Sequence, residues 1–219
     1  MLHKEISSAL ADQIKSSTEE NANMLSHGIG FILFLVAIPF LLFKASKTNT
    51  DWVVWGTILY SISLLMVYTS STLYHQNKKA LTRKKLRIFD HISIYFLIAG
   101  TYTPFILKYL QNTTGWITLI ALWSTVLLGS IFKLFFTHKF NLFSTLAYLA
   151  MGWAAVFIAK PLYETAPTAA LIWIGVGGLS YTIGTVFYLK KNLYLGHFIW
   201  HLFVLGGSLA HFIAVWCIF

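Results

Sequence analysis

The chain has 219 residues, of which 57% are hydrophobic and only 11% charged, and its formal net charge is +9. A soluble globular domain carries about 25% charged residues, so these few charges exclude a surface that is covered mainly by water. The single cysteine excludes a disulfide framework or a thiolate metal cluster. Because the basic residues fall in short connections between apolar runs, they indicate contact with an anionic membrane surface and not with nucleic acid.

A helix needs roughly 20 apolar residues to cross a hydrocarbon layer about 30 Å thick. The sequence contains seven such runs, each continuously apolar and without the alternation of a membrane β-barrel. They lie at about 24–44, 52–74, 88–107, 115–136, 142–160, 168–189 and 196–218. We therefore expect an all-α polytopic membrane protein, a seven-transmembrane helix bundle that forms one domain over residues 1–219. Residues 1–23 precede the bundle as a short cytoplasmic segment, and the capping-box spacing of Ser17 and Glu20 predicts that the first helix starts just before Asn21.

The distribution of lysine and arginine predicts the orientation, because cytoplasmic loops are enriched in both residues. With the N-terminus in the cytoplasm, 12 of the 16 basic residues lie on the cytoplasmic side and the C-terminus lies outside. The 12 are Lys4, Lys15, Lys78, Lys79, Arg83, Lys84, Lys85, Arg87, Lys133, Lys139, Lys190 and Lys191.

Ionisable residues at the rims of the predicted spans are costly in a membrane, and each is therefore a functional candidate. His75 ends the second span, Asp90 and His91 begin the third, and His197 and His201 begin the seventh. The predicted topology places all five near the cytoplasmic face. Their shared depth indicates that they belong to one site.

His197 and His201 are four residues apart and therefore lie on the same helix face, where both imidazoles can reach one ion. His75 supplies a third nitrogen at the same depth. Three histidines with an open fourth position are the pattern of a catalytic zinc, so the sequence predicts Zn²⁺ at these residues. The alternative is that the histidines are interfacial residues bonded to backbone carbonyls.

Asp90 is the predicted partner of the water at the open zinc position, which a carboxylate can orient and deprotonate. The alternative for Asp90 is an ion pair with Arg87, one turn away. Ser71 lies one turn before His75, and its hydroxyl could bond to the water or a developing oxyanion. Ser71 could instead bond to the backbone of its own helix.

The remaining histidines of the spans receive other roles. His27 begins the first span on the cytoplasmic side and is a candidate to support the metal ligands from behind. His91 points roughly 100° away from Asp90 on a helix, which makes it a weaker ligand candidate. His211 lies ten residues beyond His201, about 15 Å along a helix. It is therefore predicted to be a buried hydrogen-bonding residue outside the metal site.

Several motifs resemble the progestin and adipoQ receptor superfamily, to which the adiponectin receptors belong. The resemblance covers the first three spans and the last. It consists of Glu20-x-x-Asn23-x-x-Ser26-His27-x-x-Gly30, Ser71-x-x-x-His75, Asp90 followed by Gly100-Thr101-Tyr102-x-Pro104, and His197-x-x-x-His201. The short tails and the stretch 100–105 are most similar to the bacterial hemolysin III branch.

The resemblance implies a seven-helix bundle with a cytoplasmic N-terminus and a zinc held by His75, His197 and His201. It also implies that Asp90 contacts the zinc-bound water with Ser71 beside it, and its first motif adds Glu20 and Asn23 as supporting residues together with His27. The superfamily is similar to alkaline ceramidases, which suggests hydrolysis of an amide or ester in a lipid.

We therefore expect a zinc-dependent hydrolase of a membrane lipid, involved in lipid homeostasis and located in the plasma membrane, as in a bacterial inner membrane. Two alternatives remain at this point. The chain could be a non-enzymatic sensor or regulator in which zinc has a structural role. It could also be a cytolysin, as the hemolysin name suggests. The sequence names no protein partner.

Overall fold

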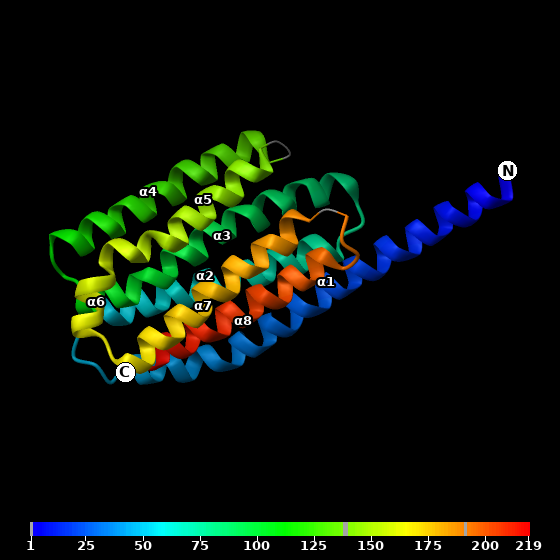
Figure 1. The fold of residues 1–219 in the computed structure, drawn as a ribbon. Helices are drawn as coiled ribbons and strands as arrows, with labels where there is room; N and C mark the ends of the chain where they lie inside the picture. Colours follow the sequence, from blue (N-terminus) through cyan, green and yellow to red (C-terminus); the bar gives the residue numbers. More distant parts are fainter. Residues whose placement is uncertain (1, 138–139, 191) are drawn as a thin grey trace.

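The computed structural model describes residues 2–137, 140–190 and 192–219, and these residues form helices and no strand. The helices run side by side along one axis (Figure 1). They are α1 (Leu2–Ala45), α2 (Asp51–Gln76), α3 (Ala80–Tyr109), α4 (Thr113–Phe136), α5 (Asn141–Trp153), the 3₁₀ helix η1 (Ala154–Ile158), α6 (Ala159–Thr165), α7 (Thr168–Leu189) and α8 (Gly196–Trp216). The predicted all-α polytopic bundle is confirmed.

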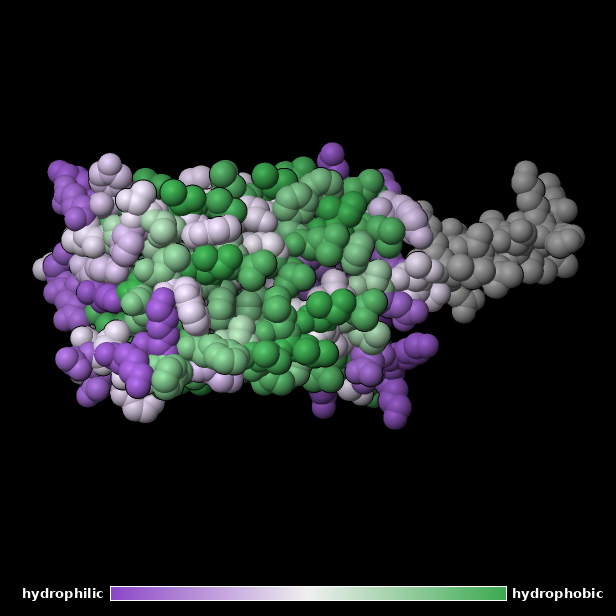
Figure 2. Space-filling model, turned by 90° about the horizontal axis from the view of Figure 1, so that it is seen from below, coloured by the Kyte–Doolittle hydropathy of each residue, from purple (hydrophilic) through white to green (hydrophobic). Residues whose placement is uncertain are grey.

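The surface of the bundle is that of a membrane protein. Figure 2 shows a broad hydrophobic band between two hydrophilic ends. Large apolar side chains such as Ile32 and Phe43 are more than 60% exposed. Among the described residues, six segments are long and apolar enough to cross a membrane. They lie at Ser17–Ala45, Asp51–Gln76, Thr113–Phe136, Leu142–Thr165, Thr168–Leu189 and Gly196–Trp216. The remaining long helix, α3, runs between α2 and α4 (Figure 1).

The helices form a ring that largely follows the chain order and closes where α8 meets α1. Neighbouring pairs are α7 and α8, α8 and α1, α1 and α2, α2 and α3, and α3 and α4, while α5 contacts α3 and α7. The first turns of α3 carry Arg83, Lys84, Lys85 and Arg87, and we call this end of the bundle the basic end. Lys139 and Lys191, which were also assigned to this side, lie outside the described residues.

Two elements differ from the sequence-based expectation. The first helix does not start at Asn21, because α1 continues unbroken through Ser17 and Glu20 from Leu2. The span predicted at 142–160 is not one regular helix, since a 3₁₀ segment separates α5 from α6. The hydroxyl of Tyr102 on α3 lies at this break, where it accepts from the Ala155 amide at 2.8 Å and contacts the Met151 carbonyl at 3.0 Å.

Helix α8 is held by other helices at both of its ends. At the basic end, the backbone amide of His197 donates to a Glu19 carboxylate oxygen at 3.3 Å. At the opposite end, Lys44 donates to the Trp216 carbonyl at 3.0 Å, and Lys108 donates to the carbonyl of Ile218. An anion at the start of a helix and cations at its end also favour the helix dipole. These contacts fix the position of α8 along the bundle axis.

We expect Tyr102→Phe to destabilise the bundle by about 1–2 kcal/mol, because backbone groups at the break would lose their hydroxyl partner. Denaturation of the purified protein in detergent measures this change. Tyr163→Phe is the matched control, since Tyr163 is 76% exposed. Equal stability of the two variants would contradict a role for the Tyr102 hydroxyl in holding the break.

Candidate metal centre

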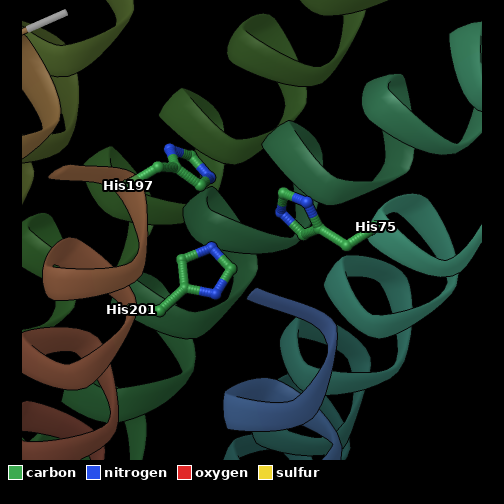
Figure 3. Close-up of side chains that lie close together, drawn as sticks. All are labelled: His75, His197 and His201. Carbon is green, nitrogen blue, oxygen red and sulfur yellow. The ribbon is translucent and has the colours of Figure 1, made fainter. Parts of the chain in front are cut away.

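Three histidines from two helices meet at the basic end of the bundle. His75 lies in the last turn of α2, and His197 and His201 lie in the first turns of α8. Their ring centroids are 4.7–5.2 Å apart, and Figure 3 shows the three rings around a common space. One nitrogen from each ring lies within 4.8 Å of the other two. This group could hold a metal ion.

The hydrogen bonds of His75 suit a metal ligand. Its Nδ1 lies 2.8 Å from Oε2 of Glu20 on α1, and its Nε2 is buried without a hydrogen-bond partner among the described residues. A carboxylate that accepts from one imidazole nitrogen fixes the tautomer and leaves the lone pair of the other for a metal. The unpartnered Nε2 therefore fits a metal at this position.

His201 is oriented by the next turn of α1. Its Nδ1 lies 3.3 Å from both the carbonyl oxygen of Asn23 and the hydroxyl oxygen of Ser26. Ser26 itself donates to the Asn23 carbonyl at 2.9 Å, so the Ser26 oxygen can accept from the Nδ1–H of His201. With Nδ1 engaged in this way, Nε2 of His201 is the nitrogen available to a metal.

His27 supports His201 by ring stacking. The two ring centroids are 3.7 Å apart with an angle of 25° between the planes. Both nitrogens of His27 are buried without a hydrogen-bond partner among the described residues. His27 therefore lies against one of the three histidines and outside the group of three.

Arg83 extends the support of His75. Its guanidinium donates to Oε1 of Glu20 and lies 4.8 Å from the centre of the Tyr74 ring. Burial alone would lower the pKa of Arg83, but the Glu20 carboxylate reverses this effect and holds the pKa above its usual value. Sequence reasoning counted Arg83 only as a topology signal, because no local pattern indicates its contact with a residue 63 positions earlier.

Asp90 and Ser71 line the same cavity as the three histidines. Ser71 forms a hydrogen bond with Asp90, and the Asp90 carboxylate interacts electrostatically with both His75 and Arg87. The two roles considered for Asp90, beside the histidines and beside Arg87, are therefore compatible. His91 lies outside the group of three, because its Nδ1 bonds to the backbone carbonyl of Arg87 at 2.7 Å, although the same nitrogen is 3.9 Å from Oδ2 of Asp90.

A cavity of about 920 Å³ extends from the three histidines into the bundle. Beyond the polar end its wall is mainly apolar, with Val67, Leu97, Phe105, Ile158 and Leu162 among the lining residues. Pockets of this volume and character bind small molecules that are largely apolar. The three histidines, Asp90 and Ser71 therefore lie at one end of a long, mainly hydrophobic cavity.

Comparison with known proteins identifies the family. Residues 15–212 match the haemolysin-III-related family. The chain belongs to this family.

Two bacterial relatives are similar to this family member over most of its length. The hemolysin-3 homolog of Bacillus subtilis (strain 168) is 44% identical, and the match covers 90% of this chain and 92% of the relative. Hemolysin-3 of Bacillus cereus is 43% identical, and the match covers 90% of both chains.

A more distant relative is human. The human monocyte to macrophage differentiation factor is 28% identical, and the match covers 90% of this chain and 83% of the relative. No solved structure is significantly similar to this chain.

We predict that Glu20→Ala lowers the affinity of the three histidines for a metal ion by about 10–100-fold, the usual effect of losing a carboxylate behind a metal-binding histidine. Competition with a chromogenic chelator measures the affinity. Glu20→Gln should retain more of it, because an amide oxygen still accepts from Nδ1–H of His75. Glu164→Ala is the matched control, since Glu164 is exposed at the opposite end of the bundle. Unchanged affinity in Glu20→Ala would show that this hydrogen bond does not support a metal.

Proposed function

We propose that this haemolysin-III-related protein is a zinc-dependent hydrolase that cleaves an amide or ester bond in a membrane lipid. The observation that carries the proposal is the position of three histidines, a carboxylate and a hydroxyl at one end of an apolar cavity. Such a chamber suits a lipid chain, while the polar end suits the bond that joins the chain to its head group.

His75, His197 and His201 would hold the zinc. As a Lewis acid, the zinc would activate a water molecule and polarise the lipid carbonyl. Imidazoles alone also suit copper, iron and nickel, so the choice of zinc rests on the three-histidine pattern with an open position. The three rings come from α2 and α8, and α1 orients two of them through Glu20, Asn23 and Ser26.

Asp90 is the proposed general base. It shares the cavity end with the three histidines and interacts with His75. In the overall reaction, one water adds across the carbon–nitrogen or carbon–oxygen bond and yields a carboxylic acid together with an amine or alcohol. Asp90 would take a proton from the attacking water and return it to the leaving nitrogen or oxygen. The reaction needs no oxidant or reductant.

Ser71 is the proposed orienting residue for Asp90. Its hydroxyl hydrogen-bonds to the Asp90 side chain, and this contact limits the rotation of the carboxylate. The same hydroxyl also lines the cavity, where it can donate to the carbonyl oxygen of a bound lipid as negative charge develops on it.

The wall between α5 and α7 is the proposed route by which the lipid enters. Gly152 on α5 and Gly175 and Gly178 on α7 line the cavity, and no other atom lies within 4 Å of the place where a Cβ would project. Gly152 and Gly175 are also exposed. A chain in the bilayer could therefore slide sideways into the cavity at these positions. The same proposal places the protein in the cell membrane of a bacterium, with membrane lipid as its partner.

Asp90→Asn should abolish lipid hydrolysis while zinc remains bound, because an amide cannot accept the proton. Metal analysis of the purified protein and mass spectrometry of lipids incubated with it measure the two quantities. Asp51→Asn, at the exposed start of α2, is the matched control and should hydrolyse normally. If Asp90→Asn hydrolyses like the wild type, Asp90 is not the base. If the wild type binds zinc but consumes no lipid, the zinc is structural.

Gly178→Phe should reduce hydrolysis of long-chain lipids at least tenfold. The new ring would project into space that is now open at the cavity wall and would block the chain there. Short-chain analogues that need only the polar end should be cleaved at nearly the wild-type rate. Activity measured over a series of chain lengths separates these outcomes. A uniform effect at every length would contradict a role for this wall in admitting the chain.

A further inference from the structure

A second polar group lines the cavity, far from the three histidines. His211 on α8 lines the cavity wall and is only 8% exposed. Its Nδ1 is buried and has no hydrogen-bond partner among the described residues. A polar side chain in the middle of a membrane protein is costly unless it has a partner or a function.

The imidazole of His211 is held firmly by its surroundings. It stacks on the ring of Tyr181 from α7, with centroids 5.5 Å apart and an angle of 25°. The Tyr181 hydroxyl is engaged with Ser208 at 2.8 Å, and Tyr181 lines the cavity as well. A Cβ at Gly177 would lie only 2.6 Å from the His211 ring. The absence of a side chain at Gly177 therefore allows the ring to pack closely against α7.

The distance from the metal centre is given by the helix itself. His201 and His211 are on the same straight α8, and ten residues correspond to about 15 Å along its axis. The cavity is continuous between them, because both residues line it. A single extended lipid chain can therefore reach both the three histidines and His211.

We propose that His211 and Tyr181 form a subsite that recognises an oxygen in the lipid chain, a hydroxyl or oxo group about 15 Å from the group bound at the histidines. His211 would supply the hydrogen bond through Nε2, since its Nδ1 is closed off from the cavity, and Tyr181 holds its ring in place. This inference rests on the proposed function, because it takes the cavity to hold the lipid chain. It adds that the protein distinguishes chains that carry this oxygen from chains that do not. Chains without such an oxygen leave His211 unpartnered and are bound less well.

The test compares two fatty acids as probes, octadecanoic acid and 12-hydroxyoctadecanoic acid, whose hydroxyl lies near His211 when the carboxylate is at the histidines. Binding to the full-length, zinc-loaded protein in lipid nanodiscs is measured by displacement of a fluorescent fatty acid. The preference is the ratio of the two dissociation constants. We expect this preference for the hydroxylated acid to fall about tenfold in His211→Phe, because an unpartnered hydroxyl is disfavoured in an apolar cavity.

Two controls separate recognition from a loss of packing. His211→Gln keeps a hydrogen-bonding group and should retain most of the preference. The 3-hydroxy isomer carries its hydroxyl near the other end of the cavity, so its preference should be unchanged in His211→Phe. If both hydroxylated acids lose affinity equally, or if His211→Phe keeps the wild-type ratio, the subsite is overturned and a bridging water is the partner of His211.

Hydrolysis is assayed separately so that the two proposals can fail independently. A wild-type protein that cleaves lipids but binds the two acids equally would overturn the subsite alone. A protein that cleaves no lipid but shows the His211-dependent preference would overturn the hydrolase function and leave the subsite standing.

Discussion

Contacts from a short stretch of α1, residues 19–27, hold the histidine group together. Glu20 accepts from His75, the Asn23 carbonyl and the Ser26 hydroxyl lie against Nδ1 of His201, and His27 stacks on the His201 ring. An imidazole in a membrane interior has no water to satisfy its second nitrogen, so the partners that α1 supplies orient the rings of His75 and His201. Because α1 lies between α2 and α8 in the ring of helices, it can reach both helices that carry the histidines.

The same arrangement separates two environments within one cavity. Charged and hydrogen-bonding side chains gather at the basic end, where Arg83 and Glu20 join the histidine group to the first turn of α3. The walls beyond are mainly apolar up to His211. A lipid likewise has a polar head group and an apolar chain. A cavity with one polar end and mainly apolar walls therefore suits the proposed lipid ligand better than a wholly polar or wholly apolar molecule.

The helices themselves could be predicted well, but some of their details could not. Apolar runs of about 20 residues predict membrane helices regardless of the neighbours, whereas the break after Trp153 is stabilised by Tyr102, a residue about 50 positions earlier. The start of α1 was predicted wrongly, because the capping-box pattern at Ser17 and Glu20 competes with strong contacts of Glu20 to other helices. Glu20 bonds to His75 and Arg83 and is therefore not needed as a cap.

The sequence by itself determined that this is a helical membrane protein, which end of it is basic, and that His75, His197, His201 and Asp90 share one depth, since each follows from hydropathy and charge along the chain. Only the tertiary structure decided which side chains stand behind the histidines and that His211 lines the same cavity. Those contacts join helices that are far apart in sequence. Their pairing depends on the order of helices around the ring, which no local pattern specifies.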